Sequence, residues 1–95
     1  MSKPDPSDKR RLHIAFVLRY LRTEFPNYDV APFPAEYRIK VREIGGAQVI
    51  HEVAFHMAFL DDHDDPVKEV RRRGLVQRMK EKGSETVWVN TREVS

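Results

Sequence analysis

The alternation of apolar and polar positions is clearest in residues 47–60, which read AQVIHEVAFHMAFL. Val49, Val53 and Phe55 occupy odd positions, while Glu52 and His56 interrupt the even ones. A two-residue period is typical of a strand with one buried face. The segment therefore predicts the central strand of a sheet.

Two other segments show the three- and four-residue spacing of amphipathic helices. The first, residues 7–25, follows a helix start at Asp5-Pro6. Its apolar stripe consists of Ile14, Val17, Leu18, Leu21 and Phe25. Leu12, Phe16 and Tyr20 lie outside this stripe, so the helix either packs on a neighbouring loop as well as the sheet or meets a partner.

The second helical segment, residues 66–82, begins at Asp65-Pro66 and ends before Gly83, a residue type common at helix ends. Gly74 lies in its middle. A glycine inside a helix costs about 1 kcal/mol relative to alanine. We therefore expect a kink or a break into two short helices at Gly74.

Residues 36–44 alternate in the same way and predict a second strand. The side chains expected to face the core are Tyr37, Ile39 and Val41, and those expected to face away are Arg38, Lys40 and Arg42. Residues 26–34 contain three prolines, so we expect an ordered loop with Tyr28, Val30 and Phe33 against the core.

Gly45-Gly46 predicts a hairpin between this strand and the central one. A three-residue loop, Ile44-Gly45-Gly46 with a left-handed bulge at Gly46, keeps core and solvent faces separate, because directly opposed residues share a face. The register that follows pairs Val41 with Val49, Tyr37 with Val53, and Arg38 with Glu52.

Residues 85–91 form a β-branched and aromatic run that predicts the last strand. A right-handed crossover would place it parallel to the central strand. The predicted fold class is α+β, in the order α-β-β-α-β, with a three-stranded mixed sheet and two helices packed on one face. Residues 1–95 are expected to form a single small domain, with 1–6 as a flexible N-terminal arm and 92–95 as a loose C-terminus.

Composition narrows the function classes. Seventeen Lys and Arg against 15 Asp and Glu give a net charge of +2, too small for a general polyanion binder. Absence of cysteine excludes disulfides and thiolate chemistry. No apolar run approaches the ~20 residues that span a bilayer, and the start, MSKPDPSDKRR, is unlike a signal peptide. We therefore expect a cytoplasmic protein that binds no membrane.

The sequence carries no catalytic signature. Its serines lie at ends or turns, and Gly45-Gly46 lacks the spacing of a phosphate-binding loop. The carboxylates of residues 61–65 do not match a calcium loop and are favourable at a helix N-terminus without any ligand. The Arg71-Arg72-Arg73 run is typical of a solvated helix. We expect no enzyme, no cofactor, no metal and no small-molecule substrate.

The remaining candidate site is the sheet face that the helices leave open. Its predicted binding residues are Arg38, Lys40, Arg42, Glu52, His56 and Trp88. Ile50, Ala54, Ala58 and Leu60 are expected on the same face, and this apolar content favours a protein contact. The first predicted function is therefore a small non-enzymatic adaptor or inhibitor that docks a protein partner, a larger assembly or a second copy. The alternative is RNA binding, because cations around an exposed aromatic suit single strands. The third interpretation is a merely solvated face.

The predicted element order resembles the KH fold of the second type, including ribosome-binding factor A. In that family a strand ends in a Phe-Leu-acidic turn before a helix, and Phe59-Leu60-Asp61-Asp62 is similar. The resemblance implies nucleic-acid binding. The Gly-x-x-Gly loop of the family is missing, and only Gly74 stands near the expected helix kink. No site residue is carried over, and we infer no membership.

Overall fold

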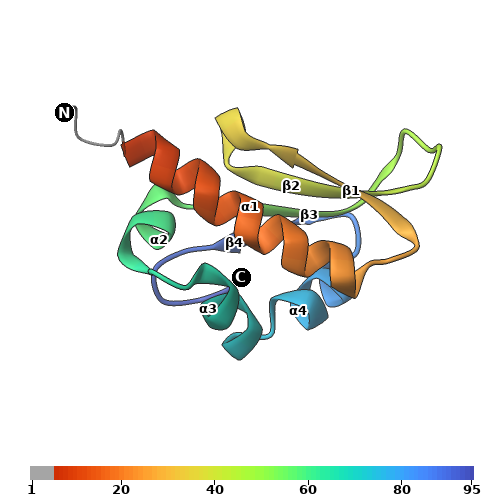
Figure 1. Ribbon diagram of the computed structural model, residues 1–95. Coiled ribbons are helices and arrows are strands. Elements are labelled where there is room, and N and C mark those ends of the chain that lie inside the picture. Colours follow the sequence, from red (N-terminus) through yellow and green to blue (C-terminus); the bar gives the residue numbers. More distant parts are fainter. Residues whose placement is uncertain (1–5) are drawn as a thin grey trace.

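The computed structural model describes residues 6–95 (Figure 1). Within these residues, four α-helices, one 3-10 turn and four strands follow one another: α1 (Pro6–Glu24), β1 (Tyr28–Phe33), η1 (Pro34–Glu36), β2 (Arg38–Glu43), β3 (Val49–Phe55), α2 (Met57–Asp62), α3 (Pro66–Arg72), α4 (Leu75–Lys82) and β4 (Thr86–Val89). Residues 1–5, most of the expected N-terminal arm, lie outside the described residues, and Pro6 already belongs to α1.

The strands form one mixed sheet in the order β1-β2-β3-β4. β1 and β3 both pair antiparallel with β2, whereas β4 pairs parallel with β3. The α+β class and the parallel last strand are confirmed. The expected count of three strands and two helices was wrong, because β1 and α2 were missed and the second helix is divided.

The missed strand β1 comes from the segment that its prolines marked as a loop. Its residues pair with the whole of β2, from Tyr28 opposite Glu43 to Phe33 opposite Arg38. Pro32 can occupy an edge strand because its missing N–H is needed only where a neighbouring strand lies on that side. Of the side chains expected against the core, Val30 is buried but Tyr28 is exposed.

The hairpin register differs from the expected one. Arg38 lies opposite Ala54, and Lys40 lies opposite Glu52. The irregularity falls between Val41 and Arg42 on β2 rather than at the turn, and the left-handed glycine is Gly45, with φ of 79°, rather than Gly46. The bulge residue opposite this step is Ile50, since Val41 faces His51 and Arg42 faces Val49. Val49 therefore lies on the face opposite to His51.

The central strand ends at Phe55, five residues before the expected end. Phe59 and Leu60 are adjacent and both fully buried, which a strand with one open face cannot achieve because neighbouring side chains point to opposite sides. The short helix α2 buries both of them, and Met57 is exposed.

Gly74 separates α3 from α4, as expected. Its φ of 70° is left-handed, a conformation that glycine adopts without a steric penalty. Asp65 begins α3 as its N-cap and accepts a hydrogen bond from the Lys68 backbone N–H at 3.1 Å. Gly83 ends α4. The predicted start and end of the second helical segment are therefore confirmed.

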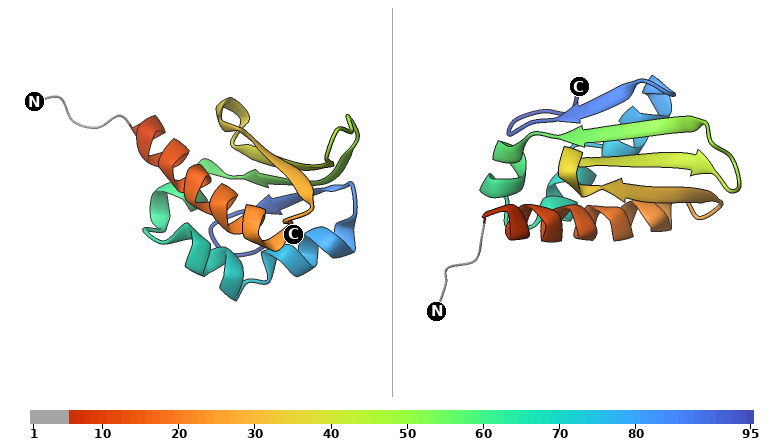
Figure 2. Two further views of the ribbon diagram at one scale, coloured as in Figure 1. Left: turned by 45° about the vertical axis from the view of Figure 1, so that its right-hand side comes forward. Right: turned by 90° about the horizontal axis from the view of Figure 1, so that it is seen from above.

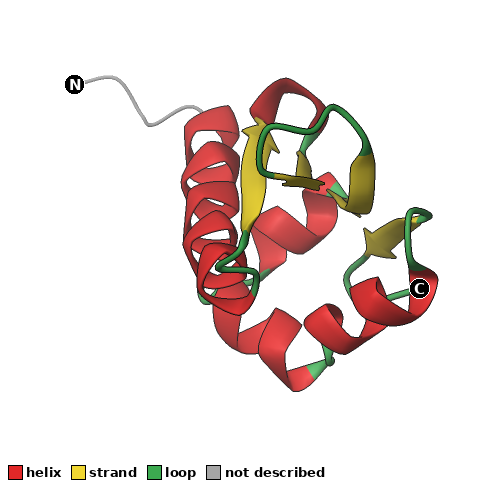
Figure 3. Cartoon of the chain, turned by 90° about the vertical axis from the view of Figure 1, so that its right-hand side faces the viewer, coloured by secondary structure: helices red, strands yellow, loops and turns green. Residues whose placement is uncertain are grey.

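All four helices lie on one side of the twisted sheet (Figure 2 and Figure 3). Helix α1 packs under β1 and β2, and α4 packs under β3 and β4. Every second side chain along the strands points inward and packs against the apolar side chains of the helices. The core includes Ile14, Val17, Leu21, Ile39, Val41, Val53, Phe59, Leu75, Met79, Val87 and Val89.

Both outer edges of the sheet carry features that hinder the addition of another strand. On β1, Arg22 Nε donates to the Val30 carbonyl at 3.2 Å, and Pro32 has no N–H to offer a further strand. On β4, Trp88 exchanges two backbone hydrogen bonds with Ser95, at 3.1 and 2.9 Å. The segment 92–95, expected to be loose, thus includes a residue that pairs with β4. Edge pairing with another chain is therefore disfavoured at both sides.

Candidate functional site

The sheet face without helices carries two cross-strand rows of side chains. One row runs Phe33, Arg38, Ala54 and Trp88 from β1 to β4. The next runs Ala31, Lys40, Glu52 and Thr86. Opposed residues share a face, so the register itself brings these side chains together. Arg42 lies on the same face beside Asp29, its opposite residue on β1.

Glu52 stands at the centre of this face and holds two of its cations. Arg38 Nη1 donates to Glu52 Oε2 at 3.1 Å, and Lys40 Nζ lies 3.7 Å from Oε1. The Thr86 hydroxyl donates to the same carboxylate. The Glu52 side chain is largely buried among them. It therefore fixes the positions of Arg38 and Lys40 from a single strand.

Trp88 is the exposed aromatic of β4, with 41% of its surface accessible. The Arg38 guanidinium carbon lies 5.3 Å from the centre of the indole, although a whole strand separates the two backbones. Arg38 therefore reaches across Ala54, which is only 1% exposed despite lying on the open face. His56, the exposed N-cap residue of α2, places its ring 5.4 Å from Trp88.

Phe33 is the aromatic at the opposite edge. It was expected against the core, and that prediction was wrong, because Phe33 lies opposite Arg38 on the open face. Lys40 Nζ lies 4.3 Å from the ring centre and the Arg42 guanidinium carbon 5.9 Å. The two prolines that flank Phe33 hid the two-residue period of β1. The signal that could have found it is the spacing of Asp29, Ala31 and Phe33, which all face away from the core.

Arg42 is the cation of this face with the fewest partners. Its Nε is buried, and among the described residues no atom is placed to accept its hydrogen bond. Arg38 and Lys40, by contrast, both pair with Glu52. A buried N–H without an acceptor costs free energy, but an atom with no accessible surface cannot itself contact an incoming ligand.

Three of the four apolar residues expected on this face lie elsewhere. Leu60 belongs to α2 and is fully buried in the core. Ile50 packs against the core from the bulge, and Ala58 is on α2. Of the four, Ala54 alone lies in a row of the open face, beneath Arg38 and Trp88. All six predicted binding residues except His56 lie on the sheet, and His56 borders it.

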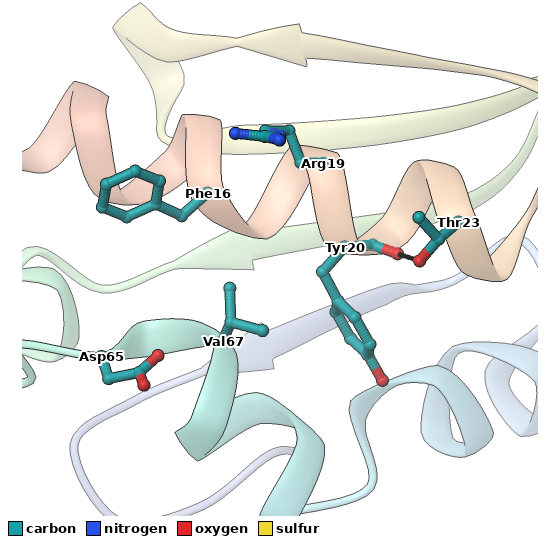
Figure 4. A pocket seen from close by; sticks show the side chains of 6 residues that line it. All are labelled: Phe16, Arg19, Tyr20, Thr23, Asp65 and Val67. Carbon is teal, nitrogen blue, oxygen red and sulfur yellow. Dashed lines mark hydrogen bonds between the residues drawn. The ribbon is translucent and has the colours of Figure 1, made fainter.

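A shallow groove of about 320 Å³ lies between α1 and α3 (Figure 4). It is lined by Phe16, Arg19, Tyr20, Thr23, Asp65 and Val67. Leu12 and Phe16 on the outer stripe of α1 are 53% and 40% exposed. Burial raises the pKa of the Tyr20 hydroxyl, with a further contribution from the Glu24 carboxylate. The wide apolar surface of α1 therefore remains partly open.

Acidic side chains of the segment 61–65 make contacts that stabilise the fold. Asp61 binds Arg10 through two hydrogen bonds of 2.8 Å, and Asp65 caps α3. His63 Nδ1 lies 3.1 Å from the Phe59 carbonyl. Among residues 6–95, no group of three or more His, Asp or Glu side chains is placed to hold a metal ion.

The three arginines of α3 and its end have separate contacts. Arg72 pairs with Glu69 at 2.9 Å, and Arg71 lies over the Tyr20 ring. The Arg73 side chain is only 8% exposed. It donates to Glu69 and to the backbone carbonyls of residues 90 and 91, at 3.0, 2.7 and 2.7 Å. This run therefore forms no shared basic patch.

Compared with protein-family models, curated proteins and solved structures, the chain matches none of them. The four-stranded sheet and the extra strand β1 also depart from the three-stranded order on which the KH resemblance was based. Across residues 6–95, none of the helices has both the length and the apolar character needed to cross a membrane.

Proposed function

We propose that this protein is a non-enzymatic nucleic-acid-binding module whose contact surface is the open sheet face. The observation that carries the proposal is the placing of two aromatic rings and three cations on one face, with Arg42 forming no ion pair with Glu52. Cations attract phosphates, and exposed rings stack on bases.

Charge supports the proposal only locally. Arg38, Lys40 and Arg42 face Glu52 and Asp29, so three positive charges oppose two negative ones. The surplus is modest, and it resides in the cation that has no ion pair with Glu52. A polyanion that binds here would gain most from Arg42.

A protein partner on this face, the first function predicted from the sequence, has lost its main support. That prediction depended on four apolar side chains, and Leu60 and Ile50 pack with the core. Apart from the small residues Ala31 and Thr86 and the partly exposed Val49, the side chains that remain accessible on this face are charged or aromatic. An acidic peptide is the protein ligand that this chemistry could still accept, and it is an outcome of the test.

Salt dependence tests the proposal. A fluorescently labelled 12-nucleotide single strand should bind with an affinity that falls between 50 and 200 mM salt, because phosphate contacts release counterions. Arg42→Gln should weaken binding and reduce the slope of log affinity against log salt by about 0.7. The matched control is Arg78→Gln on α4, which should leave binding unchanged. No binding by the wild-type protein, or binding only of an acidic peptide, rejects the proposal.

A second candidate function is self-association through the groove between α1 and α3. The exposure of Leu12 and Phe16 on one helix stripe favours it. The groove also offers a cation, Arg19, and a carboxylate, Asp65. Two copies related by a two-fold axis would present these opposite charges to each other.

Light scattering over a range of protein concentrations tests this candidate. The wild-type mass should rise toward that of a dimer, and Phe16→Asp should keep the protein monomeric. Ile44→Asp at the tip of the β2–β3 loop alters another exposed apolar residue and should not change the mass. A monomeric wild type at every concentration rejects self-association.

A further inference from the structure

The structure points to the form of the ligand: we infer that a single strand crosses the sheet from β4 to β1 and stacks one base on Trp88 and another on Phe33. This inference rests on the proposed function and specifies the ligand of the same face. It names Phe33 as a binding residue that the sequence did not reveal.

The spacing of the two rings sets the path. Phe33 and Trp88 are the ends of one cross-strand row, with Arg38 and Ala54 between them. Neighbouring strands lie ~4.8 Å apart, so the ends of the row are separated by about 14 Å. Adjacent stacked bases are only ~3.4 Å apart. Two neighbouring bases therefore cannot occupy both rings, and the strand between them must be stretched.

The side chains between the rings suit such a strand. Arg38 lies over Ala54 and presents its guanidinium beside the indole, where it can stack on a base or meet a phosphate. Near the other ring stand Lys40 and Arg42. Each ring therefore has at least one cation beside it. At each end of the row, a base can stack on the ring and its phosphate can bind the cation.

A duplex fits this face poorly. Its bases are stacked and paired, so they cannot lie on protein rings, and its major groove is read by an inserted helix or ribbon. The helices lie on the other side of the sheet (Figure 3). The β2–β3 loop and its flanks, residues 43–48, read EIGGAQ and carry no cation to enter a groove lined by phosphates.

Trp88 is the only tryptophan of the chain, so its fluorescence reports the proposed stacking directly. A 12-nucleotide oligo-U should quench it on binding, and a duplex of equal length should not. Phe33→Leu keeps apolar volume but removes the ring, and should weaken oligo-U binding roughly tenfold, within the range measured for base–aromatic stacking. Tyr28→Leu, which removes an exposed ring on the opposite face of the same strand β1, is the control and should change nothing.

A dinucleotide adds a length test, because it is too short to reach both rings. Its affinity should be low and equal for the wild type and Phe33→Leu if it binds at Trp88. Unquenched Trp88, equal binding of duplex, or an unaltered affinity of Phe33→Leu each overturns the single-strand path. If oligo-U binding still falls with salt and with Arg42→Gln, nucleic-acid binding stands and only the path is rejected. If no oligonucleotide binds, both fail.

Should Phe33→Leu unfold, Phe33→Tyr keeps the ring and its affinity should match the wild type. The wild-type fluorescence titration needs no variant at all. The path therefore remains testable whatever the stability of the substituted proteins.

Discussion

Arg10 and Asp61 lie 51 positions apart in the sequence and form a two-pronged ion pair, Nε to Oδ1 and Nη2 to Oδ2, each 2.8 Å. The pair joins the first turns of α1 to the end of α2. The Arg10 guanidinium holds the pKa of Asp61 below its usual value, chiefly through this hydrogen bond. Arg72, and then Arg73, lower the pKa of Glu69 in the same way.

These lowered pKa values predict how stability depends on pH. A carboxyl whose folded-state pKa is depressed stabilises the protein fully above its ordinary pKa, 3.8 for Asp and 4.5 for Glu, and this contribution is lost as pH falls through the folded-state value. We expect the free energy of unfolding, measured with urea from pH 7 to pH 2.5, to fall below about pH 4.5. Asp61→Asn should be less stable at pH 7 and show a shallower acid decline.

The control for this prediction is Asp62→Asn, which removes a carboxylate from the same helix turn and leaves the bridge to Arg10 intact. An identical acid decline in the two variants would show that the Arg10 bridge is not responsible.

Arg73 predicts how firmly the C-terminal segment is held. Its guanidinium bonds the carbonyls of Asn90 and Thr91 and the carboxylate of Glu69 at once. Lysine keeps the charge but cannot make this fork. We expect Arg73→Lys to lose about 1.5–3 kcal/mol in urea unfolding, the range for hydrogen bonds to charged groups. The Ser95 amide should also exchange its hydrogen faster.

Arg72→Lys is the matched control, because Arg72 binds the same Glu69 but is well exposed. It should lose much less stability than Arg73→Lys, since exposed ion pairs contribute little to folding. Equal losses in the two variants would contradict a role for the carbonyl contacts.

Gly74 predicts a purely backbone effect. A Cβ placed there meets no atom within 4 Å, so space is not limiting, but the φ of 70° is left-handed. We expect Gly74→Ala to cost about 1–2 kcal/mol in chemical unfolding. Gly74→Asn should cost less, since asparagine tolerates this conformation better. Equal stability of Gly74→Ala and the wild type would mean that α3 and α4 can merge without penalty.

Glu52 predicts an increase in binding on substitution. Glu52→Gln removes the charge that neutralises Arg38 and Lys40. On the proposed function, oligo-U should bind more tightly at low salt, and the salt slope should steepen by about 0.7 for each further phosphate that the freed cations neutralise. The control is Glu81→Gln on α4, which adds the same net charge away from the face. An equal increase in affinity in both variants would indicate a general charge effect.

Local chemistry predicted part of this fold. The Asp65-Pro66 start, the break at Gly74 and the end at Gly83 depend on neighbouring residues alone, and the side-chain parity of β2 follows from its alternation. Strand β1 was not predicted because Pro32 and Pro34 are typical of a loop, and only the pairing with β2 reveals an edge strand. Helix α2 was not predicted because the long apolar run of residues 47–60 does not show where the strand's alternation stops.

The hairpin register could not be predicted from the turn alone. The observed register goes together with contacts between His51 and residues distant from it in the sequence. His51 lies opposite Val41 on the core side, with its Nδ1 2.9 Å from the Gly83 carbonyl and its ring 5.4 Å from that of Phe25. The bulge at Ile50 accommodates this placement. For the candidate site, parity alone brought the three cations and Trp88 to one face. Phe33 was absent from the predicted open face because its strand, β1, was not predicted.

The parallel pairing of β3 with β4 has a consequence for the folding reaction. β1, β2 and β3 are joined by short connections, whereas β4 can dock only after residues 56–85 have folded back beneath the sheet. Contacts between distant segments form late because closing a long loop is entropically costly. The only tryptophan belongs to that final strand, so in a stopped-flow refolding experiment its emission will time the last event rather than the initial collapse.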